Sequence, residues 1–285
     1  MTPLPKLIVI TGPTASGKSA LAIDMALKLN TEIISADSRQ IYKGIPIATA
    51  VPPISERCGI RHHLMECLPL DAYYSAAMFA DDALAIARRL WAEGHGEAIV
   101  CGGSMMYIDA LCNGIDELPD IPDDLRHRLS DQWQTYGDEW LLAELAIVDP
   151  VCYSVIDHRN LKRVFHAVEV TRAAGKPYSS LLTGRKKAPE GFTIERHVID
   201  LPRQELFSRI NSRVEAMAHA GLLEEARSVY PLRHLNSLNT VGLKEMFRVI
   251  EGEWDLDFAL ARMAKNTRVY AKKQITWLKR DNKLP

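Results

Sequence analysis

The sequence lacks any apolar run long enough to cross a membrane, since its hydrophobic segments are short and broken by charged residues. A membrane-spanning helix needs about 20 predominantly apolar residues. The chain also has little net charge, because 35 Lys and Arg against 36 Asp and Glu give −1. No overall field therefore attracts a polyanion. Met1-Thr2-Pro3 leads straight into an apolar run without the pattern of a secretory signal, so we expect a cytoplasmic protein that makes no membrane contact.

Cysteine pairing is also missing, since the five cysteines are an odd number and contain no C-x-x-C pair. Reduced thiols without a zinc site are the simple interpretation. A hydrophobic content of 47% and a charged content of 25% are ordinary for a globular protein. The 285 residues suffice for one large domain or two modest ones with ample core.

The most informative motif is a glycine-rich segment between a predicted strand and a predicted helix. The apolar run Leu7–Ile10 precedes it, and the helix-like segment Ala20–Ala26 follows it. The order G-x4-G-K-[ST] in this context is typical of a phosphate-binding loop, because glycines let backbone N–H groups converge on one phosphate group and the helix adds its positive end. Lys18 supplies a charge, and Ser19 supplies a hydroxyl ligand for Mg2+. The residues expected to bind phosphate are Gly12, Thr14, Ala15, Ser16, Gly17, Lys18 and Ser19.

Strands and helices alternate around this motif. Short apolar strands are predicted at Lys6–Thr11, Glu32–Ala36 and Ala98–Cys101, with helical periodicity at Ser16–Leu29 and Ser75–Glu93. Such alternation favours an α/β fold with a parallel sheet covered on both faces.

Residues 113–193 have a different, mainly helical pattern. Residues 113–149 hold ten acidic and two basic residues, whereas residues 158–197 hold nine Lys or Arg and three Glu. Glu195–Leu201 resembles a return to the sheet, and long helices are expected at Gln204–Glu225 and Leu256–Lys279. We therefore expect a P-loop NTPase-like core of residues 1–112 and 194–285, its parallel sheet flanked by helices, with a mainly helical insertion domain of residues 113–193.

A carboxylate, Asp37, follows the second predicted strand. In a parallel sheet it projects from the same edge as the glycine-rich loop, where it is placed to accept a proton from an attacking nucleophile. The alternative is a cap for the turn Ser38–Gln40. The later strand ends in Cys101–Ser104, without the Asp that an NTPase normally carries there. This arrangement fits a small-molecule kinase, and it also fits a transferase whose donor is a diphosphate ester.

Further short motifs follow in order from Lys6 to about Arg280, namely Asp37–Gly44, Ile47–Ala50, Gly102–Ser104, Asp149-Pro150, Val168–Val170, Gly175–Pro177, Arg213-Val214, Gly221-Leu222, Val241-Gly242, Lys244-Glu245 and Thr267–Leu278. Together they resemble the tRNA dimethylallyltransferase (tRNA isopentenyltransferase) family. The last segment is especially close to the family's C-terminal helix. In combination these motifs are far more specific than the glycine-rich loop alone.

The resemblance implies transfer of a dimethylallyl group from dimethylallyl diphosphate to the exocyclic N6 amine of the adenine 3′ of the anticodon in tRNA. The glycine-rich loop then holds a diphosphate leaving group, with Mg2+ as cofactor. Three residues are expected to be catalytic. Asp37 orients the amine and takes its proton. Ser104 bonds a phosphate oxygen or the adenine, with a helix N-cap as the alternative. Arg213 matches the family's arginine at the diphosphate, although the sequence alone makes it a solvated charge on an amphipathic helix.

The resemblance also implies a tRNA anticodon stem-loop as partner. Two stretches are basic, namely Arg159–His166 with Arg185–Lys187 further on, and Arg262–Arg280. They suit contacts to phosphates, although a solvated helix face is the more common explanation of such stretches. Tyr270 and Trp277 are placed to stack on bases, but core packing is the stronger expectation. The residues expected to contact tRNA are Asp37, Ser38, Arg39, Gln40, Ser104, Arg126, Lys162, Arg163, His166, Lys244, Arg268, Lys272, Lys273 and Gln274.

The sequence departs from the family's pattern at several positions. Val51 stands where a basic residue is usual, and Leu243 stands where tyrosine is usual. Met105-Met106 replaces a smaller pair, and Asp157–Asn160 resembles the family's segment only loosely. The expected protein is a monomeric tRNA-modifying enzyme. The rivals are prenylation of free AMP, ADP or ATP, a small-molecule kinase, and an inactive RNA-binding relative. The insertion and the basic C-terminal helix argue against the first rival, because a free nucleotide needs no such platform.

Overall fold

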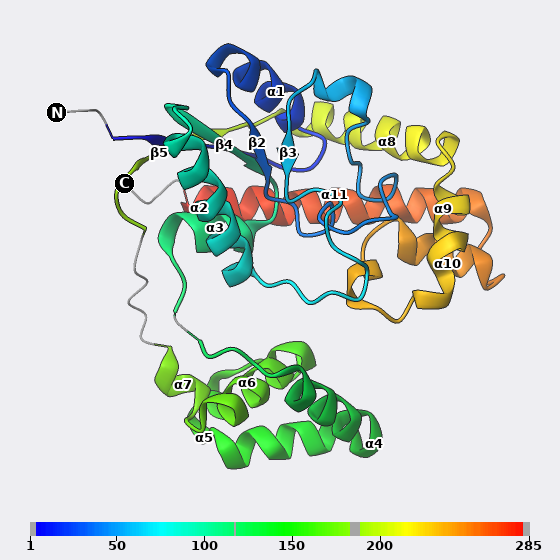
Figure 1. Cartoon of the computed structure of the whole chain (residues 1–285). Coiled ribbons are helices and arrows are strands. Elements are labelled where there is room, and N and C mark those ends of the chain that lie inside the picture. The colour runs from blue at the N-terminus through cyan, green and yellow to red at the C-terminus, as the bar shows by residue number, and fades with distance from the viewer. Residues whose placement is uncertain (1–3, 117, 183–188, 282–285) are drawn as a thin grey trace. The chain divides into compact units, whose positions relative to one another are not determined.

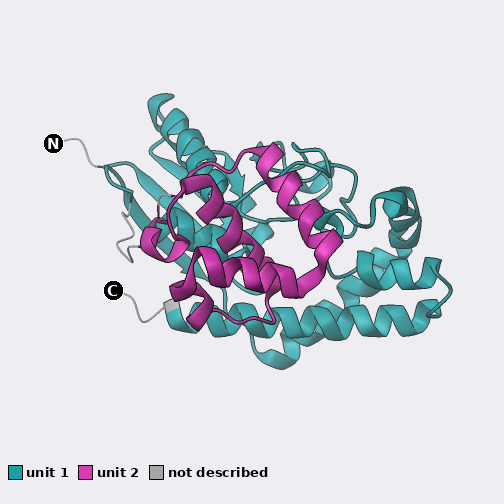
Figure 2. Cartoon of the chain, turned by 90° about the horizontal axis from the view of Figure 1, so that it is seen from below, with its two compact units in different colours: residues 1–112, 189–285 teal, residues 113–188 magenta. Residues whose placement is uncertain are grey.

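The computed structural model describes residues 4–116, 118–182 and 189–281. The chain forms two compact units, one of residues 1–112 with 189–285 and the other of residues 113–188 (Figure 2). The first unit combines a sheet with helices, and the second is built from helices (Figure 1).

The sheet of the first unit is parallel throughout, in the order β3-β2-β4-β1-β5. Its strands are β1 (Lys6–Thr11), β2 (Ile33–Ser35), β3 (His62–His63), β4 (Glu97–Gly102) and β5 (Thr193–Val198). Because the strands run in one direction, the carboxyl ends of β1, β2 and β4 lie at one edge, where α/β folds bind their ligands. Strand β3 was missed in the sequence because two histidines carry no strand-like apolar pattern.

Helices cover both faces of the sheet (Figure 1). On one face α1 (Lys18–Leu29) packs in a cluster that includes Ile8, and on the other α2 (Ala76–Ala92) and α3 (Met105–Asn113) pack in a cluster that includes Leu7. Successive residues of a strand point to opposite faces, so β1 contributes to both clusters. The continuous apolar strands of the sequence are explained by this double burial.

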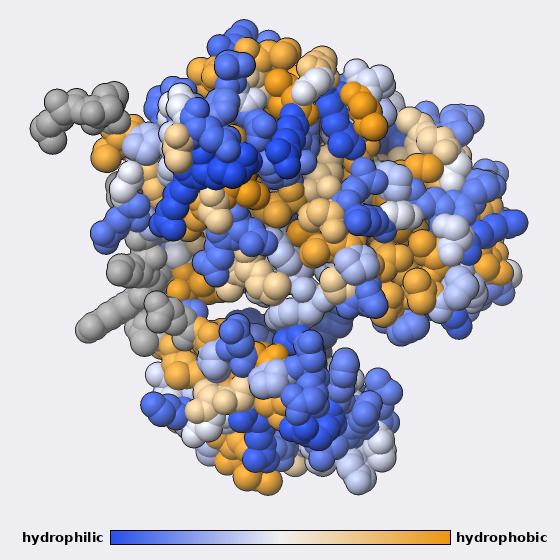
Figure 3. Space-filling model, viewed as in Figure 1, coloured by the Kyte–Doolittle hydropathy of each residue, from blue (hydrophilic) through white to orange (hydrophobic). Residues whose placement is uncertain are grey.

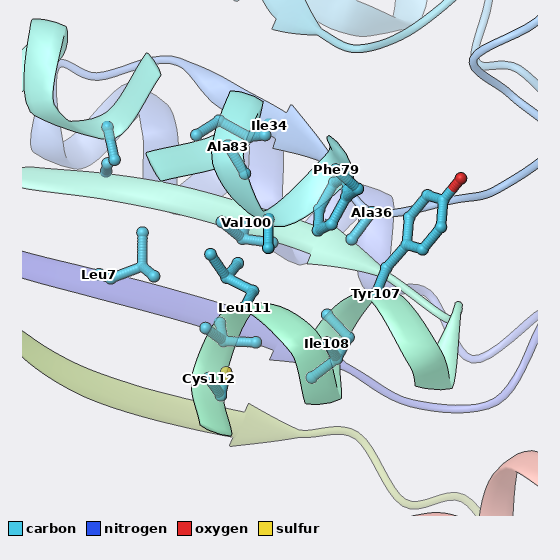
Figure 4. Packing of buried hydrophobic residues seen from close by; sticks show 14 of the residues in the cluster. Leu7, Ile34, Ala36, Phe79, Ala83, Val100, Tyr107, Ile108, Leu111 and Cys112 are labelled. Carbon is cyan, nitrogen blue, oxygen red and sulfur yellow. The ribbon is translucent and has the colours of Figure 1, made fainter. Parts of the chain in front are cut away.

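The cluster beneath α2 and α3 is closely packed (Figure 4). The rings of Phe79 and Tyr107 stack with their centroids 4.4 Å apart. Leu111 of α3 is fully buried in the same cluster. This packing fixes α3 directly behind the turn that follows β4.

Leu111→Ala is expected to lower the free energy of unfolding by about 2–5 kcal/mol, because truncating a buried leucine removes apolar burial and leaves a cavity. Urea denaturation measures the change. Leu27→Ala is the matched control, since Leu27 is 52% exposed on α1. Equal losses in the two variants would contradict the assignment of this cluster as a core.

Four helices after the sheet complete the first unit: α8 (Arg203–His219), α9 (Leu222–Val229), α10 (Leu243–Ile250) and α11 (Leu256–Asp281). Short 3-10 helices occupy Ile54–Arg57, Tyr230–Leu232 and Asn236–Leu238. The expectation of one helix over 204–225 is wrong, because α8 ends at His219 and Gly221 adopts φ 97° before α9 begins. This left-handed conformation favours glycine and ends the first helix.

The second unit contains α4 (Asp123–Val148), α5 (Pro150–Val155), α6 (Leu161–Ala174) and α7 (Tyr178–Leu181). Its separate core includes Leu141, Leu145 and Val164. Asp149 is fully buried. Its Oδ1 accepts hydrogen bonds from the Cys152 N–H at 2.9 Å and the Ser179 hydroxyl at 2.7 Å. This carboxylate therefore caps α5 and ties it to α7.

Hydrophilic and hydrophobic side chains are interspersed over the face shown in Figure 3. Large apolar side chains that are exposed include Ile54, Ile147 and Val155; single residues of this kind are normal on protein surfaces. In the part of the chain that the structure describes, none of the helices has both the length and the apolar character that a membrane crossing requires.

Candidate active site

The glycine-rich loop joins β1 to α1 at the carboxyl edge of the sheet (Figure 1). A Cβ atom at Gly12 would lie 2.8 Å from the backbone oxygen of Ile199, so a larger residue does not fit there. Gly17 has φ +93°, a conformation that side-chain-bearing residues rarely adopt. The path of the loop therefore depends on both glycines.

Several donors of this loop have no partner within the protein. Among the described residues, the backbone N–H groups of Ala15, Gly17, Lys18 and Ser19 make no hydrogen bond. The hydroxyl oxygen of Ser16 is buried and also has no partner in this part of the chain. Buried polar groups are normally satisfied, and free N–H groups at a helix N-terminus attract anions. The loop thus presents donors suited to a phosphate or diphosphate group.

The side chain of Lys18 is bound to this loop, because its Nζ donates a hydrogen bond to the Pro13 carbonyl at 2.7 Å. Desolvation of the ammonium lowers the pKa of Lys18 to about 8, and the positive charge of Arg213 acts in the same direction. Interactions with Cys101 and Asp37 raise the pKa and oppose these effects. A bound diphosphate would place negative charge next to this desolvated ammonium.

The affinity for pyrophosphate is expected to fall as the pH rises through about 8, because Lys18 attracts the anion only in its protonated form. Well above that pKa, the affinity falls by up to about tenfold per pH unit. Isothermal titration calorimetry between about pH 7 and pH 10 measures this dependence. Lys18→Met removes the titrating group, so the difference between the two profiles isolates its contribution. Parallel profiles for the two proteins would contradict the assignment.

Asp37 is half-buried and follows β2. Its Oδ1 accepts hydrogen bonds from the backbone N–H groups of Arg39 at 2.9 Å and Gln40 at 3.3 Å. In the described part of the chain, Oδ2 makes no hydrogen bond. The carboxylate therefore caps the turn with one oxygen and leaves the other for a substrate, so the two functions considered for it are compatible.

Ser104 and Arg213 occupy different surroundings. Ser104 is 7% exposed, and its Oγ accepts a hydrogen bond from the Ser38 N–H at 2.8 Å, which joins the turns after β2 and β4. Arg213 donates from Nη1 to the Thr14 hydroxyl at 3.3 Å, and burial lowers its pKa. The side chain of Arg213 is therefore directed at the phosphate loop, whereas Ser104 orients the turn that carries Asp37.

Most of these groups line a cavity of about 610 Å³. Its lining includes residues 14–20 of the loop, residues 37–40, Gly102, Gly103, Arg213, Lys244, Tyr270 and Gln274. Ser104 is not among the lining residues of the described structure. The loop, Asp37 and Arg213 thus share one space large enough for a small ligand.

Tyr270 is a cavity residue for which the sequence favoured core packing. Its side chain lines the cavity, and burial raises its pKa to about 12, with a smaller contribution from the charge of Asp37. Trp277, in contrast, packs against the cluster beneath α2 and α3. The spacing of Tyr270 and Gln274, one helical turn apart, is the signal that places both on one face of α11.

Some residues of the first unit that are expected to contact tRNA line the cavity, and others lie on α11 outside its lining. Ser38, Arg39, Gln40 and Lys244 line the cavity, but the amide of Gln40 donates to the backbone oxygens of Thr49 and Ala50, each at 3.0 Å. Outside the cavity lining, Arg268 donates to Asn211 Oδ1 at 2.6 Å, and Lys272 and Lys273 are exposed on α11. The unusual Leu243 is fully buried in an apolar cluster.

Four candidate tRNA contacts lie in the second unit, on α4 and α6. Arg126 donates from Nε to Glu169 Oε1 at 2.8 Å, and His166 Nδ1 lies 3.8 Å from Glu169 Oε2. Glu169 is 4% exposed. Lys162 and Arg163 are exposed at the start of α6. Residues Arg185–Lys187 lie outside the described residues.

The surroundings of Ser19 suit a magnesium ion bound mainly by phosphate and water, rather than a metal bound entirely by protein side chains. The described residues contain no group of three or more His, Cys, Asp or Glu side chains able to hold a metal. Mg2+ is commonly bound by one or two protein ligands together with substrate phosphates and water. An exposed hydroxyl beside the phosphate loop matches this pattern.

The sequence is similar to proteins of one family. The family model described as IPP transferase matches residues 40–281. A tRNA dimethylallyltransferase of Parabacteroides distasonis is 47% identical over 275 residues, covering 96% of this chain and 91% of the relative. One of Bacteroides thetaiotaomicron is 44% identical over 281 residues, covering 99% of this chain and 91% of the relative.

Solved structures agree with the sequence similarity. A tRNA isopentenylpyrophosphate transferase of Staphylococcus epidermidis has a TM-score of 0.67 at 32% identity and covers 96% of this chain and 90% of its own. A eukaryotic dimethylallyltransferase acting on tRNA has a TM-score of 0.81 at 28% identity and covers 96% and 70%. The similarity in sequence and in structure therefore extends over nearly the whole chain.

Proposed function

The chain belongs to the IPP transferase family, and we propose from this premise that it transfers a dimethylallyl group from dimethylallyl diphosphate to the N6 amine of the adenine 3′ of the anticodon in tRNA. One observation carries the proposal: the phosphate loop and the carboxylate of Asp37 line the same cavity. A diphosphate held by the loop and an amine held by Asp37 would meet there.

The reaction exchanges one bond for another. The bond between the allylic carbon and the diphosphate oxygen breaks, and its electron pair leaves with pyrophosphate. The lone pair of N6 forms the new carbon–nitrogen bond, and Oδ2 of Asp37 takes the N6 proton. The free N–H groups of the loop, with Lys18 and Arg213, stabilise the charge that develops on pyrophosphate.

Ser19 would hold Mg2+ together with diphosphate oxygens and water. The ion supplies charge neutralisation of the leaving group when bound. The protein's own contribution is the array of loop donors, which is already formed. This proposal rests on the exposed Ser19 hydroxyl at the start of α1.

We place the tRNA contacts on both units, and we propose a monomer that acts in the cytoplasm. An adenine in a stacked anticodon loop must be turned out before it reaches a cavity, at a cost of a few kcal/mol, so contacts to the RNA backbone have to offset this cost. The residues proposed for these contacts are Ser38, Arg39, Lys244, Arg268, Lys272 and Lys273 of the first unit, and Arg126, Lys162, Arg163 and His166 of the insertion, residues 113–188 in the structure.

One assay tests the proposal against its rivals. The protein is incubated with labelled dimethylallyl diphosphate and with either tRNA carrying adenine 3′ of the anticodon or free AMP, and in parallel with labelled ATP. Label in tRNA at that adenine is the expected result. Label in AMP alone would favour prenylation of free nucleotides. Phosphate transfer from ATP without prenyl transfer would indicate a kinase, and tRNA binding without any transfer would indicate an inactive relative.

A further inference from the structure

Gln274 of α11 joins two loops of the cavity through its side-chain amide. Its Oε1 accepts a hydrogen bond from the Thr14 N–H at 2.8 Å, and its Nε2 donates to the Gly103 carbonyl at 2.8 Å. Thr14 belongs to the phosphate loop, and Gly103 follows β4. One side chain thus links the loop after β1 to the turn after β4.

The link is enclosed and closely fitted. Gln274 is 3% exposed. A Cβ atom at Gly103 would lie 2.4 Å from Nε2 of Gln274, so the backbone approaches the amide as closely as only glycine allows. Removing either end of the amide would leave the partly buried Thr14 N–H or the buried Gly103 carbonyl without its hydrogen-bond partner, which is costly.

Neighbouring residues of α11 also contact the loop region. Ala271 and Ala15 belong to one buried apolar cluster, and Tyr270 lines the cavity. On its other side Thr14 is held by Arg213, which donates to the threonine hydroxyl at 3.3 Å. The Thr14 N–H is bonded to Gln274 and the Ser16 N–H to the Pro13 carbonyl, so the N–H groups of Ala15, Gly17, Lys18 and Ser19 are the ones available to an anion.

We propose that Gln274 is a positioning residue that sets the conformation of the phosphate loop, rather than a group that contacts tRNA. It fixes Thr14 so that the free N–H groups of Ala15, Gly17, Lys18 and Ser19 remain directed at the diphosphate, and it couples this loop to α11. The inference rests on the proposed function only in taking a diphosphate as the ligand of the loop.

Gln274→Met tests the proposal, because methionine has a similar length but neither accepts from Thr14 nor donates to Gly103. We expect the affinity for inorganic pyrophosphate, measured by calorimetry with Mg2+, to fall about ten- to a hundredfold, since a partly buried N–H and a buried carbonyl lose their partner. The affinity for tRNA without donor should stay within about twofold, as expected for a surface left intact. Gln204→Met is the control on the exposed start of α8.

Gln274→Glu provides a readout that a general loss of stability would not give. A carboxylate keeps the acceptor for Thr14 but repels the Gly103 oxygen and the diphosphate. Its protonated form restores a donor, and burial raises the pKa of a carboxyl group. Pyrophosphate binding by this variant, relative to the unaltered protein, should therefore recover as the pH is lowered from about 8 to about 6.

Unchanged pyrophosphate affinity in Gln274→Met, with weakened tRNA binding, would overturn the proposal in favour of a direct RNA contact. A constant deficit in Gln274→Glu at every pH would also overturn it, even if the methionine variant does not fold. Neither readout depends on prenyl transfer. A failure of the proposed function would instead be seen as absence of label in tRNA with the unaltered protein.

Discussion

Replacing Asp37 by asparagine is expected to lower kcat for tRNA prenylation by about 10²–10⁴-fold, the usual contribution of a well-placed general base. The asparagine carbonyl can still accept from the Arg39 and Gln40 N–H groups that Oδ1 of Asp37 binds now. The turn after β2 is therefore retained, whereas the amide cannot take the N6 proton. Single-turnover kinetics with labelled dimethylallyl diphosphate measures the rate, and calorimetry should show pyrophosphate binding close to that of the unaltered protein.

Asp24→Asn is the matched control, because Asp24 undergoes the same chemical change at an exposed position of α1, where it pairs with Lys28 at 2.7 Å. Asp37→Ala separates the two roles of the carboxylate, since alanine removes the turn cap as well as the base. Full activity of Asp37→Asn together with an inactive Asp37→Ala would assign Asp37 to the turn and remove it from the chemistry.

Lys18→Met is expected to lower kcat by about 10²–10³-fold, comparable to removing one preorganised donor from a site that stabilises an anion. The KM for dimethylallyl diphosphate should rise as well, because the ammonium attracts the diphosphate before it stabilises the leaving group. The methionine keeps the apolar stem of the lysine. It leaves the Pro13 carbonyl without the hydrogen bond that Nζ donates at 2.7 Å.

Steady-state kinetics over a range of donor concentrations separates the two effects. Lys28→Met removes a lysine from the exposed last turn of α1 and serves as the control. A change in KM alone would mean that Lys18 binds the donor and the transition state equally well. Unaltered values of both constants would exclude the loop from the donor site.

The sequence made the phosphate loop and Asp37 predictable because both depend on local rules. Glycines at fixed spacing between a strand and a helix permit the loop's path, as Gly12 and Gly17 show. A parallel sheet places the ends of its strands at one edge, which brings Asp37 toward the loop whatever the rest of the chain does. The helix break at Gly221 was missed, because glycine is tolerated within helices and its φ of 97° follows from the surrounding fold.

Helix α11 shows where periodicity alone was insufficient. Tyr270, Gln274 and Trp277 are close in sequence, yet the first two line the cavity and the third packs against the core. Spacing indicates which residues share a face of the helix. It does not indicate which face meets the phosphate loop, because that depends on how α11 packs against α8 and on the turn at Gly103.

The sequence by itself determined the α/β class, the glycine-rich loop between β1 and α1, and the place of the Asp37 carboxylate at the same edge of the sheet, because short-range geometry and strand direction fix these features. Only the tertiary structure decided the use of individual side chains. In the folded chain the amide of Gln274 bridges Thr14 and Gly103. The hydroxyl of Ser104 binds the Ser38 N–H, and Arg213 donates to Thr14 of the loop. The physical reason is that a hydrogen bond between residues far apart in the chain exists only once packing has brought both partners to the same place.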